Sequence, residues 1–553
     1  MATTTYDTII FDLGDVLFDW DEPKSVAALA ALPKHALRDM RNTATWFNFE
    51  RGLLSAEEAY RTMGKEFNIE ASLVQKAMDV AACSLRVNEP WADLVKRLAA
   101  KPGLKVYAMS NISKEHFEIL RALPLPWEAF ARVFTSADAG MRKPDLCFYQ
   151  YVIKETGCDP SRTIFLDDRA ENIVPARSLG LRGEVVNKNE RTEEGRIYRL
   201  LTNVVLGEPL ARAEEFLHAE TGQLHSIFTE TGVTFEDNYA QLLIWGLTNM
   251  EEIIYLLWPD GTRWNGSPRG SSQDDNASVP SPTDSAVVLD NWTTDSKEPR
   301  PLHHGLWNYF AGKPAGTTET FPTDGDTTSI AYLTVPQKYH NRLADPRLVM
   351  EAMASNLNAD GVMQFYFADD RPRVCVVICV NMLRFFLKYG GDDLDLDVDS
   401  RLAATRSYVV NCLINNALAD GSRHYTADAS LYFFSMLFAE LRVKAERNPT
   451  KNVNLRQTLK VHINRSLIQL LGKPADSLEL AMRLRACQVF GIEKDFYKWQ
   501  MDELLVLQEH DGGWPAGHYC KVSRSGIHIG SRGLTTALAF RILKDVEVEN
   551  LGA

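Results

Sequence analysis

The chain changes its hydrophobic pattern once, near residue 200, and this change limits it to two kinds of fold. Before that point, amphipathic helical stretches separate short apolar runs, which lie near Ile9, Val106, Val133 and Ile164. After about Glu190 helical periods dominate. The first pattern predicts a parallel sheet with crossover helices, and the second predicts an all-α domain built as a ring of paired helices. We therefore expect two domains, over residues 1–200 and 207–553.

Two segments do not fit these simple patterns. The helical block over about 21–98 is too long for one crossover helix, so we expect a helical cap inserted after the first strand. Residues 259–301 are rich in Ser, Asp, Gly, Pro and Asn, a composition that predicts a flexible insertion dispensable for folding.

Composition and charge exclude several classes of protein. The 553 residues carry a formal net charge of −13 and contain no long basic run, which argues against a nucleic-acid ligand. The eight cysteines form no CxxC pair, so we expect no structural zinc. We find neither a signal-peptide pattern nor an apolar stretch of membrane-spanning length. We expect a cytoplasmic enzyme with a small-molecule substrate. The sequence leaves open whether the chain forms a homo-oligomer.

Polar side chains follow the predicted strands of the first domain. They are Asp12 and Gly14 after the first strand, Ser110 and Asn111 after the second, Lys143 after the third, and Asp167, Asp168 and Glu171 after the fourth. Ligands of open parallel sheets bind at these strand ends. Carboxylates suit Mg²⁺, and a lysine neutralises phosphoryl charge.

The order and spacing of these four motifs resemble the haloacid-dehalogenase superfamily. The resemblance implies a phosphatase in which Asp12 attacks phosphorus, while Ser110, Asn111 and Lys143 bind the phosphoryl oxygens. It implies Mg²⁺ held by Asp12, the Gly14 carbonyl, Asp167, Asp168 and Glu171. The usual acid two residues after the nucleophile is replaced by Gly14, and Asp15 lies one residue too far along. A purely structural phosphatase fold therefore stays an alternative.

The second domain contains the segment FPTDGDTTSIAYL, from Phe321. Asp324, Asp326, Thr327 and Thr328 fall at a loop-to-helix transition, where Asp and Thr are also favoured simply as helix caps. Burial and a neighbouring carboxylate can keep one carboxyl group protonated. The pair is therefore a candidate for a carboxylic acid that stays protonated.

This DxDTT segment, together with Gln508 and the DGGW run ending at Trp514, resembles the class II terpene cyclases. The variant is that of drimane-type sesquiterpene synthases of the albicanol and drimenol kind, and the resemblance covers nearly the whole chain apart from 259–301. It implies that Asp326 donates the proton, that Asp324 is its partner, and that Thr327 and Thr328 shape the hydrogen bonding. The substrate it implies is farnesyl diphosphate, cyclised to a bicyclic drimane diphosphate and then dephosphorylated to a drimane alcohol.

Two alternatives stay open at this point: a cyclase that releases the cyclic diphosphate, and a non-catalytic interaction scaffold. Aromatic residues that can line a cyclisation site are Trp292, Trp307, Tyr309, Phe365, Tyr366, Phe367 and Trp514. Cations that can meet a diphosphate are Arg371, Arg373, Lys521, Arg524 and Arg532.

Overall fold

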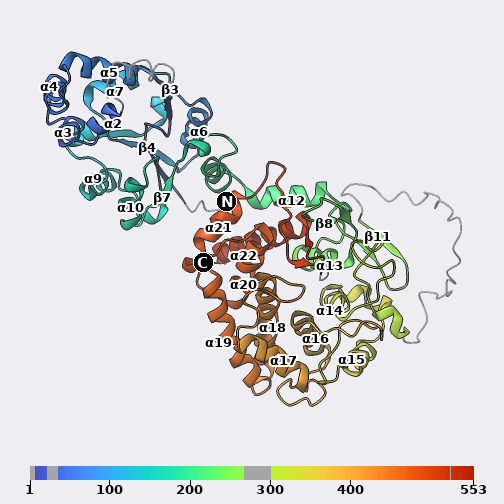
Figure 1. The fold of residues 1–553 in the computed structure, drawn as a ribbon. Helices are drawn as coiled ribbons and strands as arrows, with labels where there is room; N and C mark the ends of the chain where they lie inside the picture. Colours follow the sequence, from blue (N-terminus) through green and yellow to red (C-terminus); the bar gives the residue numbers. More distant parts are fainter. Residues whose placement is uncertain (1–5, 21–34, 267–299, 523–524, 553) are drawn as a thin grey trace, which may run out of the picture. The chain divides into compact units, whose positions relative to one another are not determined.

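The computed structural model describes residues 6–20, 35–266, 300–522 and 525–552. The chain divides into two compact units, residues 1–208 and 209–553 (Figure 1). Most of the expected insertion over 259–301 lies outside the described residues, as do Trp292, Arg524 and the first part of the expected cap. Within the described residues, no helix is long and apolar enough to cross a membrane.

The first unit is built on a five-stranded parallel sheet with strand order β5-β4-β1-β6-β7. Its strands are β1 (Thr8–Phe11), β4 (Lys105–Ser110), β5 (Arg132–Thr135), β6 (Thr163–Asp167) and β7 (Arg182–Val185). Four of them are the strands that the sequence predicts, and β7 is an addition. Parallel pairing of β1 with both β4 and β6 brings their carboxyl ends to one edge.

Helices cover both faces of this sheet because alternate strand residues point to opposite sides. Ile9 and Phe11 pack in one core with α6 (Glu89–Ala100) and α7 (Lys114–Arg121). Ile10 belongs to the opposite core, with α9 (Leu146–Thr156) and α10 (Ala170–Ser178). Both faces are therefore buried, as is usual for a parallel sheet.

A helical cap is inserted after β1. Its helices are α2 (Ala36–Met40), α3 (Ala44–Glu50), α4 (Ala56–Phe67) and α5 (Ala71–Cys83), with a separate apolar core. A capping box of Ser55 and Glu58 starts α4. The antiparallel strands β2 (Phe18–Trp20) and β3 (Leu85–Val87) connect the cap to the sheet. The described cap helices thus end at residue 83. The next helix, α6, begins inside the range 21–98 expected for the cap, but it packs on β4 of the sheet.

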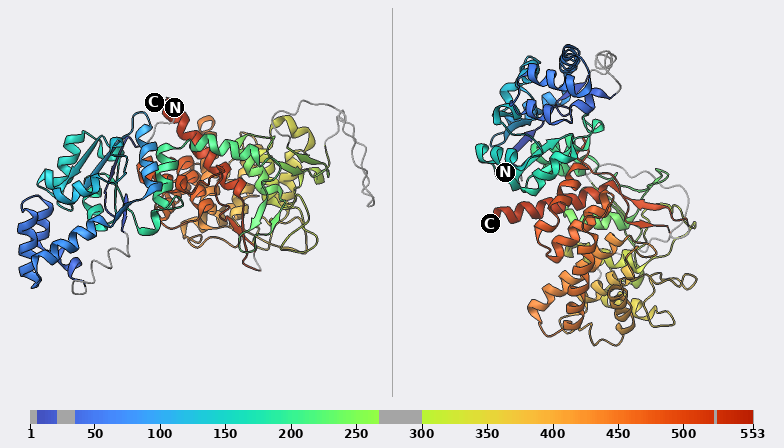
Figure 2. Two further views of the ribbon diagram at one scale, coloured as in Figure 1. Left: turned by 90° about the horizontal axis from the view of Figure 1, so that it is seen from above. Right: turned by 60° about the vertical axis from the view of Figure 1, so that its left-hand side comes forward.

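The second unit is a closed ring of inner helices wrapped by outer ones (Figures 1 and 2). Among the described residues, each inner helix packs on the next and the last packs on the first. They are α13 (Asn238–Thr248), α14 (Gly325–Thr334), α16 (Val376–Tyr389), α18 (Ala427–Arg447), α20 (Ser477–Phe490) and α22 (Arg532–Gly552). The outer helices are α12 (Pro209–Ala219), α15 (Pro346–Ser355), α17 (Ala403–Ile414), α19 (Val453–Leu470) and α21 (Lys498–Val506). This is the expected ring of paired helices.

Short strands also occur in the second unit, although the sequence pattern predicts helix and loop there. A four-stranded sheet with order β12-β13-β8-β9 joins β8 (Ser226–Phe228) and β9 (Thr234–Phe235) to β12 (Cys520–Lys521) and β13 (His528–Gly530). A second ribbon pairs β10 (Tyr255–Leu257) with β11 (Arg263–Asn265). Runs of two or three residues show no measurable alternation, so hydrophobic periodicity cannot reveal them.

Candidate active sites

The first candidate site lies at the carboxyl edge of the parallel sheet. Lys143 Nζ is 2.9 Å from Asp12 Oδ1 and 2.6 Å from Asp167 Oδ2, and it donates to the carbonyl of Met109. Carboxylate oxygens of Asp12, Asp167 and Asp168 lie within 4.8 Å of one another. The structure therefore brings together residues that are more than 150 positions apart in the chain.

The electrostatics of this edge favour a bound cation. Burial raises the pKa of Asp12 to about 6, with Asp167 adding to the effect and Lys143 opposing it. Burial together with the charges of Asp12 and Asp167 raises the pKa of Asp168 to about 7. Three crowded carboxyl groups are hard oxygen donors of the kind that Mg²⁺ prefers, and one lysine does not neutralise them.

The other residues predicted for this edge differ in their positions and in their hydrogen-bond partners. Ser110 ends β4 and lines the cleft above Asp12. The Asn111 amide exchanges two hydrogen bonds of 2.8 Å with the backbone of Lys143, which fixes the loop that carries the lysine. Glu171 is exposed and pairs with Arg169 at 2.7 Å, outside the carboxylate cluster. Asn172, one residue further, bonds both oxygens of Asp167.

Gly14 occupies the place at which a general acid is expected. A Cβ placed on Gly14 would meet nothing within 4 Å, so space alone does not require glycine there. Asp15 has a left-handed backbone (φ 55°) and its side chain lines the same cleft. The sheet edge thus contains the expected nucleophile and the cation-binding groups, while position 14 offers a carbonyl and no side chain.

The second candidate site forms where α14 begins inside the helical ring. Asp324 caps α14: its carboxylate accepts from the Thr327 N–H at 2.7 Å and from the Thr327 hydroxyl at 2.9 Å. The Thr328 hydroxyl accepts from the Trp307 N–H at 2.9 Å. Both threonines therefore fix the start of the helix, and none of these three bonds involves Asp326.

Asp326 receives its hydrogen bonds from other helices of the ring. Asn381 on α16 donates its amide to Asp326 Oδ1 at 2.8 Å, and the hydroxyl of Tyr425, which precedes α18, bonds Oδ2. Arg384 donates to the Asn381 carbonyl oxygen at 2.9 Å. A guanidinium group has only donors, so this contact orients the Asn381 N–H₂ toward Asp326.

Both carboxyl groups of the pair are buried and hold protons more tightly than usual. Burial, with the neighbouring Asp326 charge, raises the pKa of Asp324 to about 8. Burial also raises the pKa of Asp326, to about 6, because the Tyr425 and Asn381 bonds and the Arg384 charge partly offset it. Both carboxyl groups of the pair therefore hold a proton more readily than an exposed aspartate does.

A cluster of tyrosine rings lies next to Asp326. Tyr239 on α13 bonds the Tyr425 hydroxyl at 2.9 Å, and its ring lies parallel to that of Tyr519 with 6.2 Å between centroids. Tyr309 stacks on Tyr239, and the hydroxyls of Tyr309 and Tyr519 are 3.4 Å apart. Electron-rich ring faces stabilise cations. The arrangement therefore combines one acid with walls suited to a carbocation.

The remaining aromatic candidates divide between this site and the supporting structure. Tyr366 pairs with Asp324 through a backbone bridge, and Phe365 accepts the Gly325 N–H. The Phe367 N–H bonds the carbonyl of Thr323, just before the acid pair. Trp514 is fully buried and donates its indole N–H to Leu504, which fits a structural role for the DGGW run.

Sequence reasoning missed the two residues that bond to Asp326, Asn381 and Tyr425, and their own partners, Arg384 and Tyr239. One signal for two of them was present, since Asn381 and Arg384 interrupt the apolar helix VVICVNMLRFFLKY. Both are at most 5% exposed. Buried polar groups inside an apolar helix need partners and therefore mark a site.

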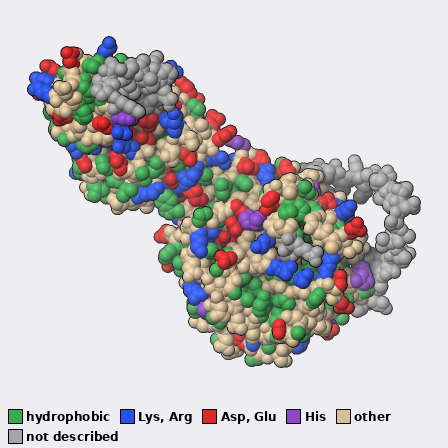
Figure 3. Space-filling model, viewed as in Figure 1, with side chains coloured by type: hydrophobic (Ala, Val, Ile, Leu, Met, Phe, Trp, Pro, Cys, Tyr) green, Lys and Arg blue, Asp and Glu red, His purple; other side chains and the backbone are tan. Residues whose placement is uncertain are grey.

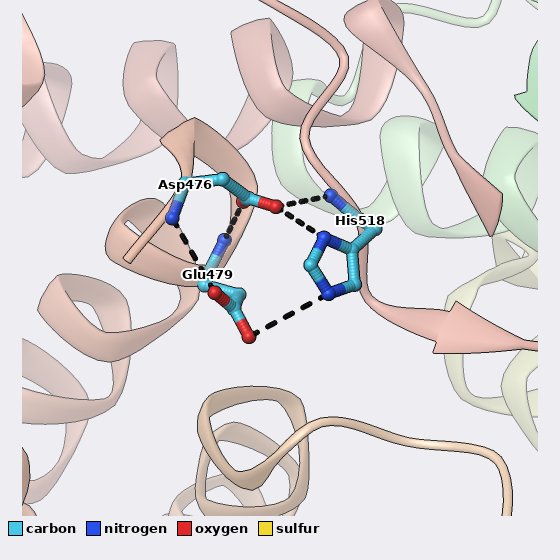
Figure 4. Close-up of side chains that lie close together, drawn as sticks. All are labelled: Asp476, Glu479 and His518. Atoms are coloured by element: carbon cyan, nitrogen blue, oxygen red, sulfur yellow. Dashed lines mark hydrogen bonds and ion pairs between the residues drawn. The ribbon is translucent and has the colours of Figure 1, made fainter. Parts of the chain in front are cut away.

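A third cluster lies beside this site and consists of Asp476, Glu479 and His518 (Figure 4). Asp476 caps α20 and also accepts the backbone N–H of His518 at 2.8 Å and its ring Nδ1. The Asp476 carboxylate is thus already bonded at both oxygens. The cluster anchors the loop that places the next residue, Tyr519, against Tyr239.

Both units of the chain match known protein families. Residues 6–180 match the family of haloacid dehalogenase-like hydrolases, and residues 210–389 match the sesquiterpene cyclase astC-like C-terminal domain. The drimenol cyclase drtB of Aspergillus calidoustus is 32% identical over 97% of this chain and 87% of its own length. The chain belongs to the drimenol cyclase family. In this family the two units are joined in one chain.

Other known proteins match about a third of this chain. The sesquiterpene phosphatase astK of Aspergillus oryzae is 33% identical over 32% of this chain and 89% of its own length. A solved HAD-like family hydrolase from Porphyromonas gingivalis covers 36% of this chain at 23% identity, with a TM-score of 0.31.

Acidic and basic side chains are interspersed on the face of each unit shown in Figure 3.

Proposed function

We propose that the helical unit cyclises farnesyl diphosphate by protonation and that the sheet unit then removes phosphate to give a drimane alcohol of the albicanol or drimenol type. The buried Asp326, bonded by Asn381 and Tyr425 within walls of tyrosine rings, carries this proposal. An alkene is a weak base, so its protonation requires an acid that is held protonated and shielded from water.

Asp326 is the better donor of the two acids. Its conjugate base is stabilised by two hydrogen bonds and by the Arg384 charge, whereas Asp324 is engaged in capping its own helix. The proton forms a C–H bond at the terminal alkene, two C–C bonds close the rings, and a proton leaves the carbon beside the final cation. The C–O bond to the diphosphate is untouched.

Several cations lie near Tyr366, whose backbone pairs with Asp324, or near His424, and are suited to the substrate diphosphate. Arg371, Arg373 and Arg423 oppose the rise that burial and Asp324 cause in the pKa of Tyr366. Burial lowers the pKa of His424 to about 4, and Arg423, Arg373 and Lys521 add to this effect. By contrast, Arg532 is bonded to Glu509 and Asp511. We place the substrate diphosphate among Arg371, Arg373, Arg423 and Lys521 and not beside Arg532.

The sheet unit supplies a second, separate reaction. Removal of both phosphates takes two rounds. In the first, the Asp12 carboxylate attacks the terminal phosphorus and the drimane monophosphate leaves; in the second, it attacks the remaining phosphorus, and the alkoxide leaves and takes a proton from water. After each round water hydrolyses the aspartyl phosphate and releases inorganic phosphate. Lys143 holds the phosphoryl charge beside Asp12. Mg²⁺ would be held by Asp12, Asp167, Asp168 and the Gly14 carbonyl, and it would supply the neutralising charge that three carboxylates require.

One observation favours a second candidate, a cyclase that releases the cyclic diphosphate unhydrolysed. Gly14 offers no side chain to protonate a leaving oxygen. Incubation of the purified chain with farnesyl diphosphate and Mg²⁺, followed by extraction with and without added phosphatase, separates the two. Alcohol without added phosphatase supports the two-step proposal. Alcohol only after its addition supports the second candidate, and an unchanged substrate contradicts both.

A further inference from the structure

A row of hydrogen-bonded side chains runs from Asp326 through the helical ring and ends at Glu440. Asn381 donates to Asp326 Oδ1 at 2.8 Å, and Arg384 donates from Nη1 to the Asn381 carbonyl oxygen at 2.9 Å. A different edge of the guanidinium group, Nε and Nη2, donates to Glu440 Oε1 at 3.0 and 2.7 Å. The row therefore crosses α14, α16 and α18, which pack on one another in this order (Figure 1).

Glu440 is the more exposed end of this row. Its side chain is 29% exposed, whereas that of Arg384 is 6% exposed. Glu440 Oε2 has no hydrogen-bond partner among the described residues, so the bonds of this carboxylate come from Arg384. Burial lowers the pKa of Arg384, but the charge and hydrogen bonds of Glu440 outweigh burial and raise it overall. Glu440 thus stabilises a buried guanidinium charge.

The charge of Glu440 also changes the effect of Arg384 on the acid. A guanidinium charge near a carboxyl group favours the ionised carboxylate, and Arg384 acts on Asp326 in this sense. Because Arg384 lies between Asn381 and Glu440 in the row, the two opposite charges form a dipole whose positive end is directed to the acid. The field of a dipole falls more steeply with distance than that of a single charge. Glu440 therefore limits how strongly Arg384 favours loss of the Asp326 proton.

Other titratable or charged groups near these two carboxyl groups come from several helices. Those near Asp326 are Asp324, Tyr239, Tyr425, Cys375, Cys379 and Cys520. Those near Glu440 are Lys388 on α16 and Tyr432 on α18, and the charges of Arg485 on α20 and Arg541 on α22 act on the same tyrosine. The Lys388 ammonium group donates to the carbonyls of Tyr332 and Leu333. Among the described residues, Arg384 is thus the cation that Glu440 bonds.

We propose that Glu440 is a positioning residue of the cyclisation: it fixes Arg384 on Asn381 and, by balancing the guanidinium charge, helps Asp326 to keep its proton. Glu440 acts through Arg384 and Asn381 and does not touch the substrate. The inference rests on the proposed role of Asp326 as the proton donor and adds a residue that sets the strength of this acid.

Glu440→Gln tests the charge, because it keeps the size of the side chain and an acceptor oxygen for Arg384. The alkaline limb of the pH–rate profile for bicycle formation from farnesyl diphosphate should move to lower pH by about one unit, since the unbalanced guanidinium group favours the Asp326 carboxylate. On the acidic plateau kcat should stay within about threefold of the parent, because a stronger acid transfers its proton at least as readily. Glu440→Asp keeps the charge and should leave the limb in place. Parent and variants share Asp324, so the difference between their limbs reports the change at Glu440.

Glu446→Gln, at an exposed glutamate of the same helix, is the matched control and should leave the profile unchanged. A profile of Glu440→Gln identical to that of the parent overturns the inference. So does a kcat lowered equally at every pH, because Glu440 would then support only the fold. If the parent chain forms no bicyclic product, the proposed cyclisation itself is refuted, and this inference with it.

A second comparison applies if Glu440→Gln does not fold with Arg384 unpaired. Arg384→Gln and the double variant Arg384→Gln/Glu440→Gln both lack the guanidinium group. The Glu440 charge remains only in the single variant, where it should keep the alkaline limb at a higher pH than in the double variant. Equal limbs in these two variants overturn the inference.

Discussion

Position 14 is where one residue bears most directly on the chemistry that we propose for the sheet edge. Gly14 leaves open space where a carboxyl group would stand two residues after the nucleophile. A phosphate leaving group departs without help, but an alkoxide needs a proton. The site as it stands is therefore better suited to breaking a phosphoanhydride bond than an alkyl phosphate ester.

Gly14→Asp should accelerate the hydrolysis of an alkyl monophosphate by about 100-fold, the usual contribution of a positioned general acid. No atom lies within 4 Å of the added Cβ, so the fold should tolerate the change. The measurement is kcat for farnesyl monophosphate, with Gly14→Asn as the control of equal size that cannot donate as an acid. Equal rates for Gly14→Asp and Gly14→Asn would show that the missing acid does not limit the reaction.

Tyr425 allows the acid of the second site to be tested through pH. In the proposed mechanism cyclisation needs protonated Asp326, whose pKa is raised to about 6, so the rate should fall as pH rises through that region. The Tyr425 bond favours the ionised carboxylate. Tyr425→Phe should therefore move the alkaline limb to higher pH and lower kcat by about 10- to 100-fold, because the conjugate base loses a charge-assisted bond.

The pH–rate profile of bicycle formation from farnesyl diphosphate checks this expectation. Tyr408→Phe is a suitable control, since that tyrosine lies on the outer helix α17. A limb that moves to lower pH, or a profile identical to that of the parent, would mean that Tyr425 does not stabilise the Asp326 carboxylate.

Residues that follow predicted strands could be assigned to one site from the sequence, whereas the partners of Asp326 on other helices could not be assigned to Asp326. Asp12, Lys143 and Asp167 meet because parallel strands end at one edge, a rule that needs no coordinates. Asn381 and Tyr425 lie 55 and 99 residues from Asp326 and reach it only because the ring closes. Their spacing in the chain is set by loop and outer-helix lengths, which carry no chemical signal.

At the scale of elements, buried ion pairs connect neighbouring helices of the ring. Arg483 on α20 bonds both oxygens of Asp428 on α18, at 2.8 and 3.1 Å, and both residues are at most 4% exposed. Arg483 also donates to the carbonyl of Lys473. Such a pair costs much desolvation, and its loss on one side leaves an uncompensated buried charge.

Arg483→Met should lower the free energy of unfolding of the helical unit by about 3–5 kcal/mol, as expected when one partner of a buried pair is removed. Denaturant unfolding followed by circular dichroism measures the change, and Arg447→Met, at an exposed arginine of α18, is the control. The double change Asp428→Leu with Arg483→Met should recover much of the loss. A double variant no more stable than Arg483→Met alone would argue against the unpaired charge as the cause.

At the scale of the whole molecule, each unit has its own apolar core and its own chemistry. The core of the helical unit draws on residues from Ala213 to Ile542, and the sheet unit and its cap have separate cores. The change of periodicity near residue 200 predicts this division, because it marks where one kind of core ends. The reaction order follows as well, since ring closure leaves the diphosphate intact for the second unit.

Two variants in separate chains test whether the reactions are independent. Asp12→Ala should close the rings normally and accumulate the cyclic diphosphate, while Asp326→Asn should form no bicyclic product. Mixing the two purified proteins should restore the bicyclic alcohol, because the charged diphosphate can pass through water from one chain to the other. Extraction and chromatography of each reaction measure the products, with each variant alone as the control.

If Asp12→Ala also fails to close the rings, the nucleophile or its metal assists the first reaction. If the mixture makes only the cyclic diphosphate although each half-reaction works, the intermediate is transferred only within one chain, and the two units depend on each other in a way that separate cores do not require.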